Sequence, residues 1–444
     1  MKKSRKLLVL MLTAVFTVTA LMGCGKKGKE TNAETESGKT EKVTEGTQNS
    51  ETKTELKGKL ELFSSKSENA GILQELINKF TAANPGVTIT LNSPSDAGTV
   101  LKTRLTKNDI PDIISMGGDA TYTELQSAGV LADLSNEPYI GNIQESYLQM
   151  LYDVNKDKDQ VAYGIPYATN ASGILYNVDM FKEVGVTVPT TWDEFIDVIN
   201  KLEAAGKQPF ELTFKDNWTC LPSWNSMAPD LMDTNFTTDR RENKTTFADT
   251  HSEVLEKYLE ILKHSPNDIM GTTYGDGNKM FAEGGAAMMI NGNWAIPEFK
   301  KINPNFKVDL FALPASNDNS KNYVTSGVDV LFAVSAQSKQ QEVAKAFVAF
   351  MVEQENAQTY VDNQFAFSAV KGVEQNDPTV AGVKADIANG KVTNFPDHYY
   401  PSGFDLASIL SEFALNYTSG MDGQENITNT LKLIDQQYDA VNVN

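Results

Sequence analysis

Trp294 is the residue whose type and position first indicate binding chemistry. It ends the run 281–294, in which a helix end, a glycine turn and a buried strand at 286–290 are predicted in that order. The turn at Asn291 and Gly292 then places the tryptophan after the carboxyl end of this strand. Ligands of open α/β sheets bind outside the carboxyl ends of strands. Trp294 is therefore a candidate ligand contact, and a position in the core is the alternative.

A search for catalytic chemistry finds little. The three histidines, His251, His264 and His398, are widely separated along the chain. The sequence patterns of zinc proteases, serine hydrolases and phosphate-binding loops do not occur in it. A partial calcium loop that begins at Asp153 lacks the required glycine and the closing glutamate. We therefore expect no catalytic residue, no metal and no cofactor. The many carboxylates leave a glycosidase pair as an alternative without positive support.

The amino-terminal residues predict an exported protein that is anchored to a membrane. Basic residues precede the apolar stretch 7–20, which is too short for a stop-transfer helix. Residues 21–24, Leu-Met-Gly-Cys, resemble a bacterial lipobox. This resemblance implies that residues 1–23 are a signal peptide and that Cys24 is lipidated at the outer face of the bacterial cytoplasmic membrane. Residues 24–57 are polar, and we expect a disordered tether there.

Composition excludes some classes of partner. The formal net charge of −19 argues against nucleic acid, because phosphate backbones attract basic surfaces. If Cys24 carries lipid, Cys220 has no disulfide partner, since the chain has two cysteines. We expect Cys220 to be a buried structural thiol rather than a nucleophile. The remaining body, 58–444, is too long for one compact core, so two lobes are expected.

The beginning of this body predicts a parallel sheet. Residues 58–63 alternate like a strand, 72–80 place apolar residues on one helical face, and 87–91 alternate again. A strand, a helix and a strand of this length form a βαβ unit, which indicates an α/β fold. Ser65 directly follows the first strand, so it is a candidate hydroxyl contact for a ligand, with a plain loop position as the alternative.

Several motifs then resemble one family. They are Asn-Pro-Gly at 84–86, Ile-Pro-Asp-Ile-Ile at 110–114, Tyr-Gly-Ile-Pro at 163–166, Pro-Thr-Thr-Trp-Asp-Glu-Phe at 189–195 and the glycine-rich run at 284–294. From Gly58 onward the chain resembles the bacterial extracellular solute-binding proteins of family 1, which serve ABC importers and include the maltose-binding type. The resemblance implies the periplasmic-binding-protein type II fold, with hinge-linked lobes and a ligand cleft between them. Lobe 1 would comprise 58–165 and 328–363, and lobe 2 would comprise 166–327 and 364–444.

The resemblance also implies roles for residues. Trp294 would stack on a sugar ring, and Trp218 would provide a second aromatic platform beside the acidic Asp216. Asp119, seven residues after the family's proline-aspartate pair at 111–112, would accept hydrogen bonds from sugar hydroxyls. A helix N-cap is the alternative role of Asp119, because it follows two glycines. Trp224 would extend the platform or pack beneath it.

Three further candidates complete the predicted site. Tyr167 and Asn170 follow the predicted first crossing between the lobes, at the expected mouth of the cleft. Tyr400 lies in the aromatic loop 395–400, where relatives also contribute to the site, and surface packing is its alternative role.

The implied function is the capture of a carbohydrate, expected to be an oligosaccharide, by hinge closure. Delivery to the permease subunits of an ABC transporter would follow, and we expect a monomer. Within the same fold, the alternative ligands are a polyamine, a metal complex or another anion. From other classes, a lipid-anchored glycoside hydrolase and a surface protein that binds another protein stay open.

Overall fold

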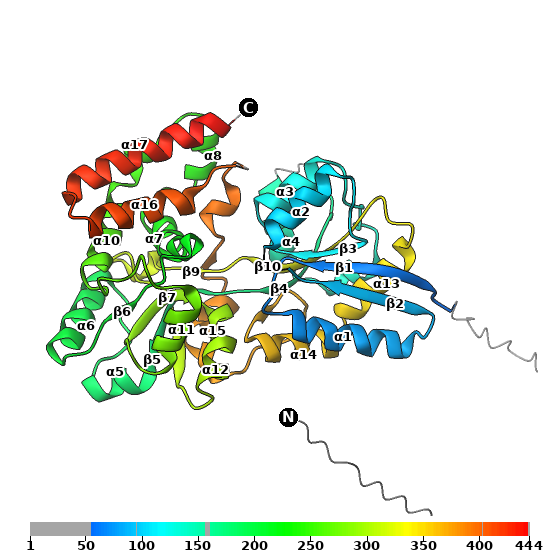
Figure 1. The fold of residues 1–444 in the computed structure, drawn as a ribbon, viewed down its shortest axis with the longest axis horizontal. Coiled ribbons are helices and arrows are strands. Elements are labelled where there is room, and N and C mark those ends of the chain that lie inside the picture. Colours follow the sequence, from blue (N-terminus) through cyan, green and yellow to red (C-terminus); the bar gives the residue numbers. More distant parts are fainter. Residues whose placement is uncertain (1–54, 95, 156–159, 402, 443–444) are drawn as a thin grey trace, which may run out of the picture. The chain divides into compact units, whose positions relative to one another are not determined.

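The computed structural model describes residues 55–94, 96–155, 160–401 and 403–442. The predicted signal peptide, the lipidation site Cys24 and nearly all of the predicted tether lie outside these residues. The described chain from residue 55 onward forms two lobes, each built around one β-sheet with helices around it (Figure 1). This confirms the expected α/β class with two lobes. Within the described ranges, no helix has the length and apolar character needed to cross a membrane.

The sheet of the first lobe has the strand order β11-β4-β10-β3-β1-β2. Strand β1 pairs in parallel with β2 and β3, which confirms the predicted βαβ unit, whereas β10 is antiparallel to β3 and β4. The strands are β1 (Gly58–Ser64), β2 (Val87–Asn92), β3 (Ile113–Met116), β4 (Ile165–Thr169), β10 (Val328–Val334) and β11 (Phe367–Ser368). The helices of this lobe are α1 (Ala70–Ala83), α2 (Ala97–Thr106), α3 (Ala120–Ser127), α4 (Glu145–Asn155), α13 (Gln341–Met351) and α14 (Gln354–Gln364).

The sheet of the second lobe has the order β12-β9-β5-β7-β6, and β8 also pairs with β5. Its strands are β5 (Ser172–Asn177), β6 (Phe210–Glu211), β7 (Met288–Gly292), β8 (Val308–Phe311), β9 (Val324–Thr325) and β12 (Val392–Thr393). Its helices are α5 (Val178–Val184), α6 (Trp192–Ala204), α7 (Leu221–Leu231), α8 (Phe236–Arg241), α9 (Phe247–Thr250), α10 (Ser252–Lys263), α11 (Tyr274–Ala282), α12 (Ile296–Ile302), α15 (Ala381–Ala388), α16 (Leu406–Thr418) and α17 (Gly423–Val441).

Both faces of this second sheet are buried. Ile174 on β5 and Ile290 on β7 belong to one apolar cluster, whereas their neighbours Leu175 and Met289 belong to a different one. Successive side chains of a strand point to opposite faces of the sheet. The two clusters therefore cover the two faces, which explains why the β7 region is a continuous apolar run rather than an alternating one.

The backbone passes between the two sheets at residues 170–171, at residues 326–327 and again after β11. The sequence predicts lobe boundaries at 165/166, 327/328 and 363/364. The second passage lies at residues 326–327. The first and third passages come later along the chain, because β4 and β11 pair with each other in the first sheet. The division into domains otherwise stays a prediction.

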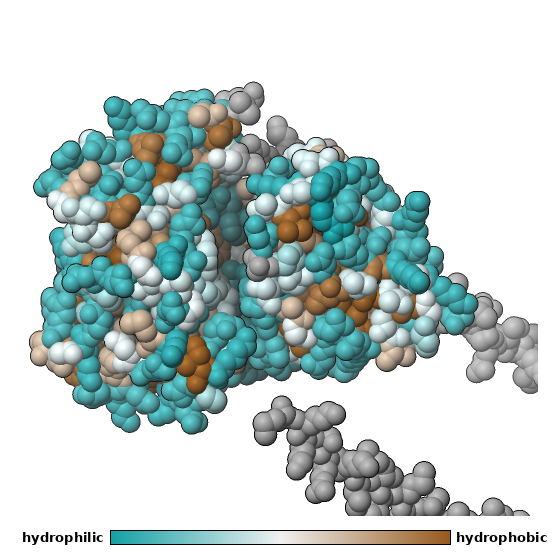
Figure 2. Space-filling model, in the orientation of Figure 1, coloured by the Kyte–Doolittle hydropathy of each residue, from teal (hydrophilic) through white to brown (hydrophobic). Residues whose placement is uncertain are grey.

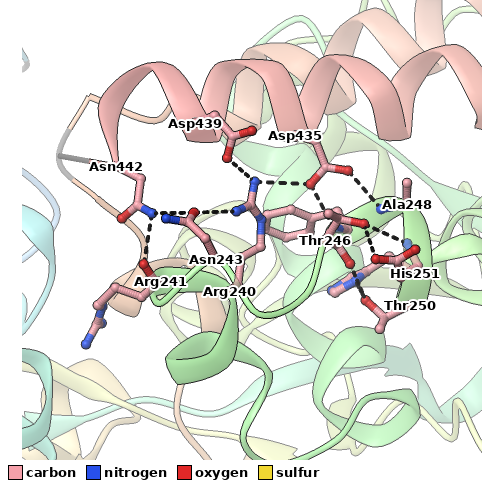
Figure 3. Close-up of polar contacts among 12 residues, drawn as sticks. Arg240, Arg241, Asn243, Thr246, Ala248, Thr250, His251, Asp435, Asp439 and Asn442 are labelled. Atoms are coloured by element: carbon pink, nitrogen blue, oxygen red, sulfur yellow. Dashed lines mark hydrogen bonds and ion pairs between the residues drawn. The ribbon is translucent and has the colours of Figure 1, made fainter. Parts of the chain in front are cut away.

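Arg240 fastens the C-terminal helix α17 to the second lobe (Figure 3). Its side chain is 2% exposed, and its guanidinium forms ion pairs with Asp435 and Asp439 of that helix. The guanidinium also lies over the Tyr438 ring, 4.3 Å from its centroid. Asp435 in turn accepts hydrogen bonds from the backbone N–H of Phe247 (2.8 Å) and of Ala248 (3.0 Å). One arginine thus joins α8, α9 and α17.

Replacing this arginine should destabilise the protein. Arg240→Ala is expected to lower the free energy of unfolding by about 3 kcal/mol, because it removes the buried partner of two carboxylates. Lys201→Ala, which breaks the exposed pair with Asp197, is the control and should change it by less than about 0.5 kcal/mol. Urea unfolding of the two variants checks this, and equal effects would show that Arg240 does not hold α17.

Candidate functional site

A cavity of about 1020 Å³ lies between the two lobes, where Figure 2 shows the surface to be hollowed. The two lobes line it with different chemistry. The second lobe contributes an aromatic wall, which we define as Trp218, Tyr274, Trp294 and Phe395. The first lobe contributes a carboxylate wall, which we define as Glu68, Asp96, Asp119 and Asp329. Of the residues predicted from sequence, the cavity brings together Ser65, Asp119, Asn170, Trp218 and Trp294.

The position of Trp294 follows from two glycines. Helix α11 ends with Gly284 in the left-handed region (φ 85°), and the N–H of Gly285 returns to the carbonyl of Met280 (2.8 Å). The chain can then enter β7 directly. At the other end of β7, a Cβ on Gly292 would lie 2.0 Å from the Trp294 ring, so the indole rests against the bare backbone there. The ring is partly exposed and lines the cavity, and its contact with a ligand stays a prediction.

Trp218 is the second tryptophan of the aromatic wall. Its side chain is 39% exposed, and it packs edge-on against Tyr274, with 5.0 Å between the ring centroids. Asp216, predicted as a ligand contact, does not line the cavity. Its carboxylate instead accepts a hydrogen bond from the backbone N–H of Tyr274 (2.6 Å). Asp216 therefore supports a cavity residue, which corrects the predicted role.

Asp119 caps a helix and also lines the cavity. Its Oδ1 caps helix α3 by accepting hydrogen bonds from the N–H groups of Thr121 (2.8 Å) and Tyr122 (3.3 Å). Among the described residues, no hydrogen-bond donor reaches its Oδ2, and the side chain lines the cavity. One oxygen is therefore structural, and the other is available to a ligand hydroxyl.

A charged network lies on the first-lobe side of the cavity. Lys66, next to Ser65, pairs with Asp329 (2.8 Å) and with Glu68 (3.6 Å). The amide of Asn170 donates to the same Asp329 carboxylate (2.9 Å). Burial alone would lower the pKa of Lys66, but the two carboxylates outweigh burial and hold that pKa above its ordinary value. Lys66 is thus protonated, and the carboxylates of Asp329 and Glu68 already compensate its positive charge.

A second-lobe carboxyl group also lies next to the cavity lining. Asp397 lies directly before His398, which lines the cavity. Burial raises the pKa of the Asp397 carboxyl, and the Asp119 carboxylate of the first lobe adds to this rise. Lys301, a further cation of the cavity lining, is paired with Glu298 one helical turn earlier. The described lining therefore presents carboxylates in excess of unpaired cations.

Three aromatic residues that were candidate ligand contacts do not line the cavity, because their side chains lie in the apolar cores, and of the two roles given for Trp224 only packing beneath other residues agrees with its burial. Tyr167 is 1% exposed and packs against Phe332 and Tyr360 in the first lobe. Trp224 is fully buried and stacks on the His251 imidazole, with ring centroids 5.0 Å apart. Tyr400 is 5% exposed and belongs to the core that Phe247, Phe404 and Tyr438 share. In each case, burial of a large aromatic surface outweighs exposure at the cavity.

Sequence reasoning missed several lining residues: Lys66, Tyr274, Asp329, Phe395 and His398. Asp329 carried a signal, since it is a lone carboxylate within the apolar strand β10. The sequence predicts a ligand contact in the loop 395–400, but at Tyr400 rather than at Phe395 or His398. Lys66 and Tyr274 had no local signal.

Neither a metal-holding cluster nor a reactive thiol is found among the described residues. No group of three or more side chains among them could hold a metal ion. Cys220 is buried, and burial raises the pKa of its thiol to about 12, so the thiol is protonated and inert at neutral pH, as predicted.

Comparison with known proteins finds similar chains. The family model described as bacterial extracellular solute-binding protein matches residues 64–358. The multiple sugar-binding protein of Streptococcus mutans serotype c is 31% identical over 329 residues, which cover 71% of this chain and 76% of that protein. The melibiose/raffinose/stachyose-binding protein MelE of Bacillus subtilis strain 168 is 23% identical over 390 residues, or 83% and 87% of the two chains. SBP RafE, solved in complex with raffinose, is 26% identical with a TM-score of 0.73, and the match covers 86% of this chain and 100% of RafE.

Adding a methyl group beneath the indole should move Trp294. Gly292→Ala is expected to lower the free energy of unfolding by about 1–3 kcal/mol through overpacking, and to raise the acrylamide quenching of tryptophan emission. Gly71→Ala is the control, because a Cβ at that position meets nothing within 4 Å. If both variants keep the wild-type quenching, the ring does not depend on Gly292.

Proposed function

The chain belongs to the bacterial extracellular solute-binding protein family, and from that premise we propose that it captures a neutral oligosaccharide in the cavity between its lobes. Its fold is the expected two-lobed periplasmic-binding-protein type II fold. Its relatives include proteins named for binding multiple sugars and for binding melibiose, raffinose and stachyose. These names support an oligosaccharide as the ligand class.

The observation that carries the proposal is the pairing of an aromatic wall with a carboxylate wall. A pyranose has an apolar C–H face and a rim of hydroxyl groups. Trp294 and Trp218 can stack on the face, while the free oxygen of Asp119 can accept hydroxyl protons. A volume of about 1020 Å³ is at the upper end for ligand sites and accommodates more than one sugar ring.

Charge favours a neutral ligand within the carbohydrate class. The lysines that line the cavity, Lys66 and Lys301, already have carboxylate partners. An acidic sugar or a phosphate would therefore meet no unpaired lysine there and would face several carboxylates. Hydroxyl groups meet no such repulsion and can donate to the same carboxylates.

The remaining parts of the proposal concern location and delivery. The family is extracellular, and the lipobox-like residues 21–24 support attachment of the mature protein through lipidated Cys24. The loaded protein would act as a monomer and pass its ligand to an ABC permease. Closure follows if the ligand contacts both walls only when the lobes approach, because a ligand stabilises the state that it binds better.

A thermal-shift screen tests the ligand class. Raffinose, stachyose or melibiose at 100 times its Kd should stabilise the purified protein by about 2.7 kcal/mol and raise its Tm. Spermidine and a ferric complex are the non-sugar controls. A rise with a control alone would remove the carbohydrate assignment. Release of monosaccharides from the bound sugar would show hydrolysis instead of binding.

Loss of the Trp294 ring should weaken sugar binding. Trp294→Ala is expected to cost about 2 kcal/mol, or roughly thirtyfold in Kd, because it removes a stacked anchor. Trp192→Ala is the matched control, since Trp192 is also partly buried but packs on α6 beside Phe195, away from the cavity. Calorimetric titration measures both. An unchanged Kd together with a lowered Tm would mean that Trp294 is structural.

A further inference from the structure

Asn293 precedes the cavity residue Trp294 and is hydrogen-bonded to the first passage between the lobes. Its Oδ1 accepts a hydrogen bond from the backbone N–H of Ala171 (2.7 Å), and its own N–H donates to the carbonyl of Ala171 (3.0 Å). Ala171 is part of the first passage between the sheets. Asn293 is 2% exposed, so these bonds are shielded from water. Asn293 of the second lobe thus forms two hydrogen bonds with the backbone of the first passage.

The other end of the same amide reaches the first lobe. Asn293 Nδ2 donates to the carbonyl of Phe365 (2.8 Å), which ends helix α14. Each polar atom of the side chain therefore has one backbone partner, and the two partners belong to different parts of the hinge region. The amide bridges the first passage and the end of a first-lobe helix.

Phe365 is held in an unfavourable backbone conformation. Its φ of 53° lies in the left-handed region, which a bulky residue with a Cβ rarely adopts. Two contacts with the second lobe compensate. One is the hydrogen bond from Asn293, and the other is the packing of its ring against the apolar cluster that contains Ala171 and Ala295. A strained residue held by contacts with the other lobe responds to any change in the angle between the lobes.

Trp294 connects this bridge to the ligand. It follows Asn293 in the same short 3₁₀ turn, residues 293–295, and packs against the same apolar cluster as Phe365. A ring that shifts against a sugar therefore moves the peptide that carries the bridging amide. Trp294, which lines the cavity, is therefore adjacent in sequence to Asn293, which is hydrogen-bonded to the strained end of α14.

We propose that Asn293 is a positioning residue that sets the angle between the lobes and couples this angle to the binding of a sugar against Trp294. The inference rests on the proposed function for its ligand, but the bridge itself exists without ligand. The Asn293–Phe365 hydrogen bond and the left-handed Phe365 together stabilise one lobe angle. Breaking the bond changes the populations of lobe angles before any sugar is added.

Asn293→Asp tests the bridge selectively. A carboxylate still accepts from the N–H of Ala171, but it cannot donate to the Phe365 carbonyl, which it repels. The ratio of lobe arrangements in ligand-free protein should change by about tenfold. The distance between spin labels at Lys79→Cys in α1 and Lys201→Cys in α6 measures it. The full-length chain is used, with Cys24→Ser so that only the two sites are labelled and Cys220 stays buried.

Asn322→Asp is the matched control. Asn322 is equally buried, accepts from the N–H of Ser316 (2.8 Å) and donates to the carbonyl of Thr190 (2.9 Å), all within the second lobe. This variant should lose thermal stability but keep the wild-type distance distribution. A shift of the same size in both variants would overturn the inference, since the effect would then be general destabilisation.

A second variant keeps the test decisive if Asn293→Asp folds poorly. Phe365→Asn suits the left-handed conformation and keeps the carbonyl that accepts from Asn293, but it removes the ring that packs on the second lobe. It should shift the distance distribution in the same direction as Asn293→Asp. An unchanged distribution, or a shift in the opposite direction, contradicts the proposed bridge.

Sugar binding separates this inference from the proposed function. The Kd for raffinose should change with the population of the binding-competent arrangement, since apparent affinity scales with that population. A shifted distribution with an unchanged Kd would overturn the coupling to Trp294. If wild-type protein binds none of the sugars, the proposed function fails, whereas the ligand-free distances still decide whether Asn293 sets the lobe angle.

Discussion

The site depends on one constraint, the hydrogen bonding of two passages that run side by side between the lobes. The N–H of Asn170 donates to the carbonyl of Gly327 (3.3 Å), and the N–H of Gly327 donates back to Asn170 Oδ1 (3.1 Å). The side-chain amide of Asn170 also donates a hydrogen bond to the Asp329 carboxylate, which in turn forms an ion pair with Lys66. Buried backbone groups outside a sheet need such partners. The two passages therefore bend together, and the cavity residues attached to them keep their relative positions.

Gly327 also connects this hinge to the aromatic wall. A Cβ at that position would lie 3.0 Å from the Phe395 ring and 2.6 Å from the side chain of Asn394. Only the bare backbone lets the ring approach the hinge so closely. The rings of Phe395 and Trp294 are in turn 6.5 Å apart, centroid to centroid. The aromatic wall thus contacts the second passage through Phe395, and the carboxylate wall adjoins the same passage through Asp329 at the start of β10. A ligand that needs both walls must bring them together.

The parts of this arrangement that sequence could predict have local causes. Gly284 ends a helix because its backbone adopts the left-handed region, which glycine favours. Trp294 follows a short apolar strand, so its position is also indicated by neighbouring residues in the sequence. Lys66 and Asp329 meet only because β1 and β10 both pair with β3, a relation that no local window contains. Tyr167 and Trp224 were misassigned because an aromatic residue near a cleft and one in the core look alike in sequence. Asp119 shows why two alternative roles could not be separated from sequence: one carboxylate oxygen caps helix α3, while the side chain still lines the cavity.

The ion pairs of the cavity support the proposal that its ligand is neutral. Lys66 and Asp329 are paired before any ligand enters, so their charges are already compensated. A charged ligand would have to break such a pair or enter without a partner, and both routes leave a desolvated charge uncompensated. A sugar hydroxyl needs only one acceptor, and Asp119 offers an oxygen that the fold does not use. The same carboxylate can therefore cap a helix in the free protein and bind a hydroxyl in the loaded one without any change in the charge of the site.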